Sequence, residues 1–218
     1  MRDRRIQGLM LVTDRDLCQG RCLEDVVMQA VRGGVAWVQL REKHLPTRVF
    51  VEQALRLKQR LAPAGVPLLV NDRVDVALAV GADGVHLGQQ DMSVPVARRL
   101  LGPGAIVGLT VERWEDVEEA QDLEVDYLGV SPVFATATKT DTKGAWGLQG
   151  LARVRAYSRH PLVAIGGLNA ANIADVVRAG ADGVAVVSAI CGAPEPQQAA
   201  VDLVRRMRAA TSSQGEGD

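Results

Sequence analysis

The chain has 218 residues and a formal net charge of -1; 47% of its residues are hydrophobic and only 3% are aromatic. This length suits one domain, and the nearly neutral charge excludes a basic surface of the kind that binds nucleic acid. No apolar run approaches the roughly 20 residues that cross a bilayer, and no apolar signal segment follows the charged residues 1–5, so we expect no membrane partner. The scattered residues Cys18, Cys22 and Cys191 predict reduced thiols in a cytoplasmic protein.

Short apolar runs alternate with amphipathic stretches along the chain. We expect strands at residues 9–13, 37–40, 67–70, 84–87, 106–109, 127–130, 162–165 and 183–187. Helices are expected at residues 23–32, 47–61, 74–80, 94–101, 115–121, 172–179 and 197–209. This alternation predicts a single (β/α)8 TIM barrel over residues 1–210, with a doubly wound open sheet as the alternative. The polar residues 211–218 are predicted to form a disordered tail.

A short sequence recurs within the chain. Gly81-Ala82-Asp83-Gly84-Val85 returns as Gly180-Ala181-Asp182-Gly183-Val184. Each copy reads as a helix-ending glycine followed by a turn into a strand. The recurrence indicates either an internal duplication or the ordinary chemistry of such turns. In both cases Asp83 and Asp182 would lie at the face of the barrel that serves stability.

Polar residues follow two neighbouring predicted strands. Asp72 comes directly after one strand, and Asp91 follows the next. Because the carboxyl ends of parallel strands share one face of a barrel, we expect the two carboxylates to lie together. Mg²⁺ prefers one or two carboxylates combined with substrate phosphate oxygens and water, so this pair predicts a magnesium site. The alternative is that Asn71 and Asp72 cap the helix that begins near Val74.

The same face collects groups that bind anions. Arg41 and Lys43 follow the second strand and can reach one phosphate together with Lys139, unless they form a solvated surface turn. Gly166-Gly167 after the seventh strand, with Val187 and the short helix at Ser188, predicts a second phosphate cradle.

Residues 131–147 lack periodicity and join the sixth strand to a helix. A structureless segment of this length is usually functional, so we interpret it as a lid over the site; a surface insertion is the alternative.

No candidate nucleophile for covalent catalysis emerges from the chain. His86 lies inside a predicted strand and is expected to be a hydrogen-bonded core histidine, whereas His44 and His160 lie in predicted loops. Two anion cradles and a metal site without a nucleophile favour chemistry that stabilises a leaving anion.

Six motifs follow one another between about residues 11 and 190: Gln39-Leu40-Arg41-Glu42-Lys43, Asn71-Asp72, Gly84-Val85-His86-Leu87-Gly88-Gln89-Gln90-Asp91, Thr136-Ala137-Thr138-Lys139-Thr140, Ala164-Ile165-Gly166-Gly167 and Ser188-Ala189-Ile190. Together they resemble the thiamine phosphate synthase family. The resemblance implies a TIM-barrel transferase that joins hydroxymethylpyrimidine pyrophosphate to thiazole phosphate, giving thiamine phosphate and pyrophosphate. It also implies a dissociative mechanism in which pyrophosphate leaves first and the thiazole nitrogen captures a pyrimidine-methyl cation.

The resemblance assigns roles to residues by position. The pyrimidine pyrophosphate would be held by Gln39, Leu40, Arg41, Glu42, Lys43, Asn71, Thr110 and Lys139. Among these, the catalytic groups would be Arg41, Lys43, Thr110 and Lys139. The thiazole phosphate would be held by Thr136, Ala137, Thr138, Gly167, Val187 and Ser188. Asp72 and Asp91 would hold Mg²⁺.

The chain departs from the family pattern at a few positions. Thr110 stands where the family usually has serine, and Glu112 where it often has histidine. Trp146 lies in a segment that more usually contains proline. A related thiazole tautomerase shares the barrel but typically lacks the second metal carboxylate and the lid lysine, so Asp91 and Lys139 favour the synthase.

A non-catalytic binder of phosphorylated ligands is a third interpretation. Barrels of this kind often assemble into homo-oligomers, but the sequence defines no interface.

Overall fold

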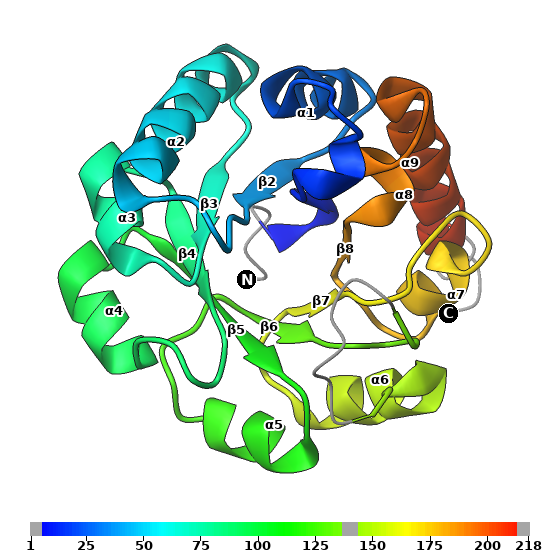
Figure 1. Cartoon of the computed structure of the whole chain (residues 1–218). Helices are drawn as coiled ribbons and strands as arrows, with labels where there is room; N and C mark the ends of the chain where they lie inside the picture. Colours follow the sequence, from blue (N-terminus) through cyan, green and yellow to red (C-terminus); the bar gives the residue numbers. More distant parts are fainter. Residues whose placement is uncertain (1–5, 137–143, 213–218) are drawn as a thin grey trace.

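A computed structural model describes residues 6–136 and 144–212 of the chain. Its centre is a closed barrel of eight parallel strands, in which each strand pairs with the next and β8 pairs with β1 (Figure 1). The strands are β1 (Gly8–Val12), β2 (Trp37–Leu40), β3 (Leu68–Asn71), β4 (Gly84–Leu87), β5 (Ile106–Val111), β6 (Tyr127–Val130), β7 (Leu162–Ala164) and β8 (Gly183–Val186). The closed strand order confirms the predicted TIM barrel and excludes the open sheet.

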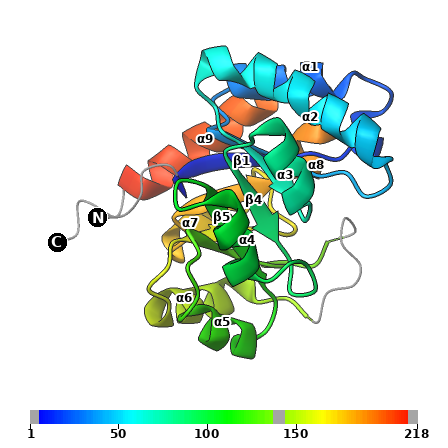
Figure 2. The ribbon, with the colours of Figure 1, turned by 90° about the vertical axis from the view of Figure 1, so that its left-hand side faces the viewer.

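Helices surround the barrel, and Figure 2 looks onto α3 and α4, which lie over β4 and β5. The helices are α1 (Leu23–Arg32), α2 (Thr47–Leu61), α3 (Val74–Val80), α4 (Val94–Leu101), α5 (Trp114–Ala120), α6 (Gly147–Tyr157), α7 (Ile173–Arg178), α8 (Ser188–Cys191) and α9 (Pro196–Ser212). Two 3-10 turns, η2 (Asp16–Cys18) and η3 (Ala62–Ala64), complete the described elements. Within the described ranges, no helix is long and apolar enough to cross a membrane.

Several predicted boundaries differ from the structure by a residue or more, and two of these differences affect the site and the predicted tail. Strand β5 continues to Val111, so Thr110 lies inside the strand and its side chain is fixed by strand geometry. Helix α9 continues to Ser212, so the predicted tail begins at least two residues too early. The hydroxyl of Thr211 donates to the carbonyl oxygen of Met207 within that last turn, 3.1 Å away, which compensates for the polar side chain. Residues 213–218 of the predicted tail lie outside the described residues.

The hydrophobic core has two layers. The larger layer fills the space between strands and helices and consists mostly of valine, leucine and alanine. The smaller layer fills the barrel itself with side chains from alternate strand positions, including Met10, Trp37, Leu69, Ile106 and Tyr127. Two of the chain's few aromatic side chains, Trp37 and Tyr127, meet edge to face here with their centroids 5.2 Å apart. The barrel interior is therefore a packed core below the level of the site.

Aspartates hold the loops that precede the strands, at the amino-terminal face of the barrel. The Oδ2 of Asp83 accepts a hydrogen bond from the N–H of Leu68 at 2.9 Å, and the Oδ2 of Asp182 accepts one from Leu162 at the same distance. Asp126 makes the equivalent bond to Val107 at 2.8 Å, although its sequence is not a copy of the repeat. These bonds tie the start of a strand to the start of its predecessor, which confirms that Asp83 and Asp182 lie at the amino-terminal face of the barrel.

Candidate functional site

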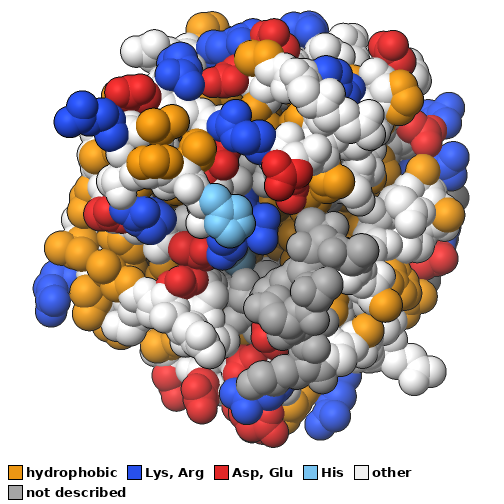
Figure 3. Space-filling view, in the orientation of Figure 1, with side chains coloured by type: hydrophobic (Ala, Val, Ile, Leu, Met, Phe, Trp, Pro, Cys, Tyr) orange, Lys and Arg blue, Asp and Glu red, His pale blue; other side chains and the backbone are white. Residues whose placement is uncertain are grey.

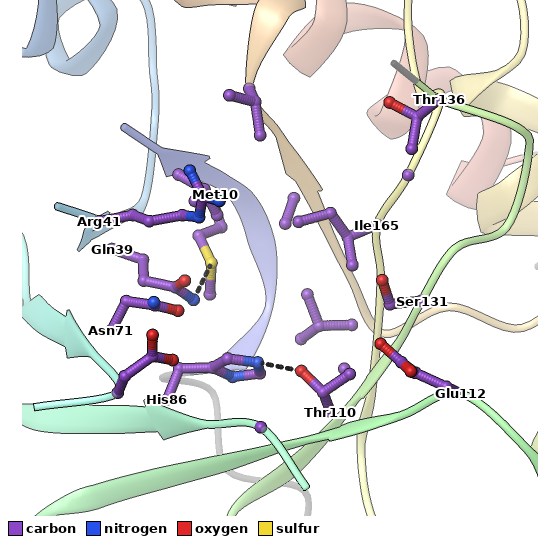
Figure 4. Close-up of a pocket in the computed structure, with 18 of the residues that line it drawn as sticks. Met10, Gln39, Arg41, Asn71, His86, Thr110, Glu112, Ser131, Thr136 and Ile165 are labelled. Atoms are coloured by element: carbon purple, nitrogen blue, oxygen red, sulfur yellow. Dashed lines mark hydrogen bonds between the residues drawn. The ribbon is translucent and has the colours of Figure 1, made fainter. Parts of the chain in front are cut away.

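A cavity of about 430 Å³ lies at the carboxyl ends of the strands. Its volume falls within the roughly 300–1,000 Å³ that sites for small molecules occupy. The predicted site residues that line it are Gln39, Arg41, Lys43, Asn71, Asp72, Asp91, Thr110, Thr136, Gly167, Val187 and Ser188. Figure 4 shows Gln39, Arg41 and Asn71 on one side of this cavity and Ser131, Thr136 and Ile165 on the other. On the outside of the molecule, acidic and basic side chains gather together near the centre of the face shown in Figure 3.

Two predicted residues do not line the cavity. The Leu40 side chain is fully buried in the layer between the strands and the helices. The carboxylate of Glu42 accepts a hydrogen bond from Arg15 at 3.0 Å instead. Strand alternation explains Leu40, because its neighbours Gln39 and Arg41 take the inward positions. The predicted site residues Ala137, Thr138 and Lys139 lie outside the described residues.

Asp72 stands at the exit of β3 in a left-handed backbone conformation, with φ of 62°. Its N–H donates to the carbonyl oxygen of His86 at 2.8 Å, which ties this turn to β4. Helix α3 has Arg73 as its N-cap and shows no side-chain capping bond, so the capping alternative is wrong. The Asp72 carboxylate instead accepts a hydrogen bond from the Lys43 ammonium at 2.5 Å.

The carboxylate of Asp91 faces that of Asp72. Burial raises the pKa of Asp91, a hydrogen bond from the Gly88 N–H at 2.7 Å opposes that shift, and the neighbouring Asp72 raises the pKa further. Two carboxylates that disfavour each other's charge at a cavity wall are a suitable donor set for a divalent cation. Within the described ranges, no group of three or more His, Cys, Asp or Glu side chains is arranged to hold a metal ion. Magnesium therefore stays a prediction, with substrate oxygens and water as the further ligands it would need.

The cations at the end of β2 are positioned by nearby oxygen atoms. The backbone N–H of Arg41 donates to the hydroxyl of Thr13 at 3.0 Å, and its guanidinium lies 3.6 Å from the carboxylate of Asp14. The Lys43 side chain is 44% exposed and paired with Asp72. Both cations therefore reach the cavity mouth, where an incoming anion could exchange with their carboxylate partners.

The glycine pair after β7 has a packing role that the sequence did not indicate. Gly166 and Gly167 have φ of 102° and 68°, which a residue with a side chain rarely adopts. A Cβ on Gly166 would lie 2.5 Å from a side-chain atom of Pro132, and one on Gly167 would lie 2.8 Å from the carbonyl oxygen of Ala135. The pair thus lets the segment after β6 pack tightly on it, and it also lines the cavity beside Val187 and Ser188.

Two backbone hydrogen bonds join the ends of the segment predicted to be a lid. The N–H groups of Trp146 and Gly147 donate to the carbonyl oxygens of Pro132 and Val133, at 2.9 and 2.8 Å. Trp146 therefore helps to join the two ends of the segment beside the glycine pair. Residues 137–143, on which the lid prediction mainly rests, lie outside the described residues.

The floor of the cavity contains a hydrogen-bonded histidine. The Nδ1 of His86 lies 2.8 Å from the Tyr127 hydroxyl. Its Nε2 lies 2.7 Å from the Thr110 hydroxyl, a contact shown in Figure 4. The hydrogen bonds of His86 are as predicted, but its placement in the core is wrong, because the half-buried ring lines the cavity. Tyr127 lines the floor as well and was not anticipated. A usable signal was Gly108 on the neighbouring strand β5, which leaves room for the large inward side chain of Tyr127.

These features define a (β/α)8-barrel enzyme whose cavity combines paired carboxylates and cations with a glycine turn. Comparison with known proteins makes the assignment specific. Residues 9–190 match the family model described as thiamine monophosphate synthase. The thiamine-phosphate synthase of Albidiferax ferrireducens is 59% identical over 203 residues, which cover 92% of this chain and 93% of that protein. The corresponding protein of Leptospira biflexa is 54% identical over 203 residues, covering 91% and 97%.

A solved structure agrees with these sequence matches. Thiamine phosphate pyrophosphorylase from Pyrococcus furiosus superposes with a TM-score of 0.86 at 37% identity, and the match covers 94% of this chain and 97% of that one. The chain therefore belongs to the thiamine monophosphate synthase family, which confirms the resemblance found in its motifs.

Proposed function

We propose that this chain is a thiamine-phosphate synthase that joins hydroxymethylpyrimidine pyrophosphate to thiazole phosphate and releases pyrophosphate. Support comes from the family match over residues 9–190 and from 59% identity to a relative named for this activity. The structural observation that carries the proposal is one cavity with two polar walls. One wall bears Arg41, Lys43, Asp72 and Asp91, and the other bears Thr136, Gly167, Val187 and Ser188. We place the enzyme in the cytoplasm, in keeping with its reduced cysteines.

The wall formed by β2, β3 and β4 suits the pyrophosphate. Arg41 can offer its guanidinium fork to phosphate oxygens, and Lys43 can offer a point charge. Lys139 is assigned to the same group by resemblance. When the bond between the methylene carbon and the pyrophosphate oxygen breaks, negative charge grows on the departing group. Fixed cations at that position stabilise the charge without reorganising water.

Asp72 and Asp91 would hold Mg²⁺ against the same pyrophosphate. The bound ion would supply further positive charge for the departing diphosphate oxygens. Below it, Gln39, Asn71 and Thr110 would orient the pyrimidine ring. The apolar side chains of Val163 and Ile165 face the cavity on its other side and would exclude water from the carbon that loses pyrophosphate.

The opposite wall suits the thiazole phosphate. Gly167 brings the backbone close to the cavity because it has no side chain. The Asn172 amide donates to the carbonyl oxygen of Gly167 at 2.9 Å and so fixes this turn. The hydroxyl of Ser188 stands at the start of α8 and can donate to a phosphate oxygen. Binding on the two walls would direct the thiazole nitrogen toward the reactive carbon.

The activity is tested by incubating the chain with both phosphorylated precursors and Mg²⁺ and detecting the fluorescent thiochrome derivative of the product. Pyrophosphate release should require both substrates and the metal ion. Isomerisation of the thiazole without pyrophosphate would favour the tautomerase alternative. Binding without turnover of either substrate would favour a phosphate-ligand binder.

The metal assignment is tested with Asp91→Asn, which keeps the shape of the side chain and removes its charge. We expect pyrophosphate release to slow by about 100-fold or more, because the metal stabilises the departing charge. The matched control is Asp122→Asn, which neutralises an exposed carboxylate outside the cavity. Equal rates for Asp91→Asn and the parent at every Mg²⁺ concentration would remove Asp91 from the metal site.

A further inference from the structure

The cavity floor contains an ordered stack of three rings. Trp37 meets Tyr127 edge to face, and Tyr127 stacks on His86 with centroids 5.4 Å apart and ring planes inclined by 23°. Two glycines make the stack fit: a Cβ on Gly108 would lie 2.1 Å from Tyr127, and one on Gly129 would lie 2.9 Å from the His86 ring. The rings are thus held by the strands on either side and have little freedom to rotate.

The hydrogen bonds of Tyr127 have a direction. The Nε2 of Gln39 lies 3.7 Å from the Met10 sulfur, which can only accept, so the Gln39 amide turns its N–H groups toward the floor. Burial raises the pKa of Tyr127, and a hydrogen bond from the Gln39 side chain to the Tyr127 hydroxyl opposes that shift. The phenol therefore keeps its proton, accepts from Gln39 and has its own hydrogen available for the Nδ1 of His86, 2.8 Å away.

We infer that Tyr127 is a positioning residue that fixes the tautomer of His86 and, through it, the direction in which the Thr110 hydroxyl donates. With Nδ1 accepting from Tyr127, the proton of a neutral imidazole must reside on Nε2. That N–H donates to the Thr110 oxygen, 2.7 Å away. The hydrogen of Thr110 is then left to point into the cavity.

This relay of hydrogen bonds, from Tyr127 through His86 to Thr110, makes Thr110 a donor rather than an acceptor toward the substrate. A heteroaromatic ring nitrogen with a free lone pair is the chemical group that such a donor recognises. Assigning that nitrogen to the pyrimidine substrate rests on the proposed function. The Gln89 amide donates to the Thr110 carbonyl at 2.7 Å, so the backbone of this residue is also held in place. The opposite tautomer would turn a hydroxyl lone pair toward the ring nitrogen, where two acceptors would face each other.

The tautomer can be measured without substrate. The chain has three histidines, so ¹⁵N-labelled imidazole spectra are assignable with His86→Gln as the reference. We expect His86 in the parent protein to carry its proton on Nε2. Tyr127→Phe keeps the ring and removes the hydroxyl, and should give a mixture of both tautomers. The control is Tyr157→Phe, which removes the chain's other phenol hydroxyl from a half-exposed site on α6.

A kinetic measurement connects the tautomer to binding. In Tyr127→Phe, the KM for the pyrimidine substrate should rise by about three- to tenfold, the effect of one hydrogen bond that is no longer oriented. The KM for the thiazole phosphate should not change, whereas a general disturbance of the barrel would alter both. A proton on Nδ1 of the parent protein, or an unchanged tautomer in Tyr127→Phe, would overturn the inference. Because the spectra need no turnover, they decide the relay even if the chain lacks synthase activity.

Discussion

Removing the carboxylate of Asp182 should be one of the most destabilising single changes outside the cavity. This side chain is 6% exposed, pairs with Arg155 at 2.7 Å and accepts from the N–H of Leu162 at 2.9 Å. Asp182→Ala leaves the guanidinium, itself only 22% exposed, without its carboxylate and leaves a strand N–H unsatisfied. Breaking a buried pair in this way costs about 3–5 kcal/mol. For a domain of this length, that corresponds to a fall in melting temperature of roughly 10 °C.

The repeat within the chain supplies the matched comparison. Asp83 makes the same bond to the N–H of Leu68, but among the described residues it has no cation paired with it. Asp83→Ala should therefore cost only about 1–3 kcal/mol, the penalty for an unsatisfied buried donor. Urea unfolding of both variants with unchanged m-values measures the difference. Equal costs, or a cost below about 1 kcal/mol for Asp182→Ala, would refute the reasoning. Both variants should keep the parent turnover rate where they are folded, since these aspartates lie at the face opposite the cavity.

Two further changes test the glycine turn and a buried histidine. Gly167→Ala should cost about 1–3 kcal/mol and weaken thiazole phosphate binding in calorimetry, because its Cβ would press on the segment after β6. Gly65→Ala is its control, since Gly65 has φ of 64° but no atom within 4 Å of an added Cβ; an equal loss in both variants would contradict the packing argument. Burial lowers the pKa of His160 below its ordinary value of about 6.5, so the unfolded chain binds more protons and stability should fall as pH drops through that value. His160→Gln should reduce this loss in urea unfolding at pH 7.5 and 5.5; an unchanged pH dependence would show that other groups cause it.

The sequence predicted the fold well because each strand is a short apolar run that ends in glycine or polar residues. The bounds of β2, β4 and β6 agree with their predicted ranges. Two-residue alternation along β2 places Gln39 and Arg41 inward and Leu40 outward. Applied to the motif, it separates Leu40 from the residues predicted to bind substrate. Contiguous motifs mark a stretch of chain, but only every second residue of a strand reaches the barrel interior.

Contacts between strands could not be predicted in the same way. Gly108 pairs in register with both His86 on β4 and Tyr127 on β6, and this pairing brings the two rings together. No local pattern specifies that register, because it depends on how all eight strands close. The glycines after β7 raise a related difficulty. A glycine pair in the sequence indicates that another group packs closely against the backbone, but that group can be a ligand or another segment of the protein.

From the base of the barrel to its mouth, the inward side chains are ordered by the free-energy cost of removing each from water. Leu69 and Ile106 are buried in an apolar base. One step higher lie the polar groups of Gln39, His86 and Thr110, each with a hydrogen-bond partner. The charged side chains of Arg41, Lys43 and Asp91 stand at the mouth, where solvent reduces the cost of their charge. A substrate with an uncharged aromatic ring at one end and a diphosphate at the other matches this gradient in one orientation only. For the proposed synthase, this order of layers would select the direction in which the pyrimidine enters, with its leaving group at the solvent side from which pyrophosphate could depart.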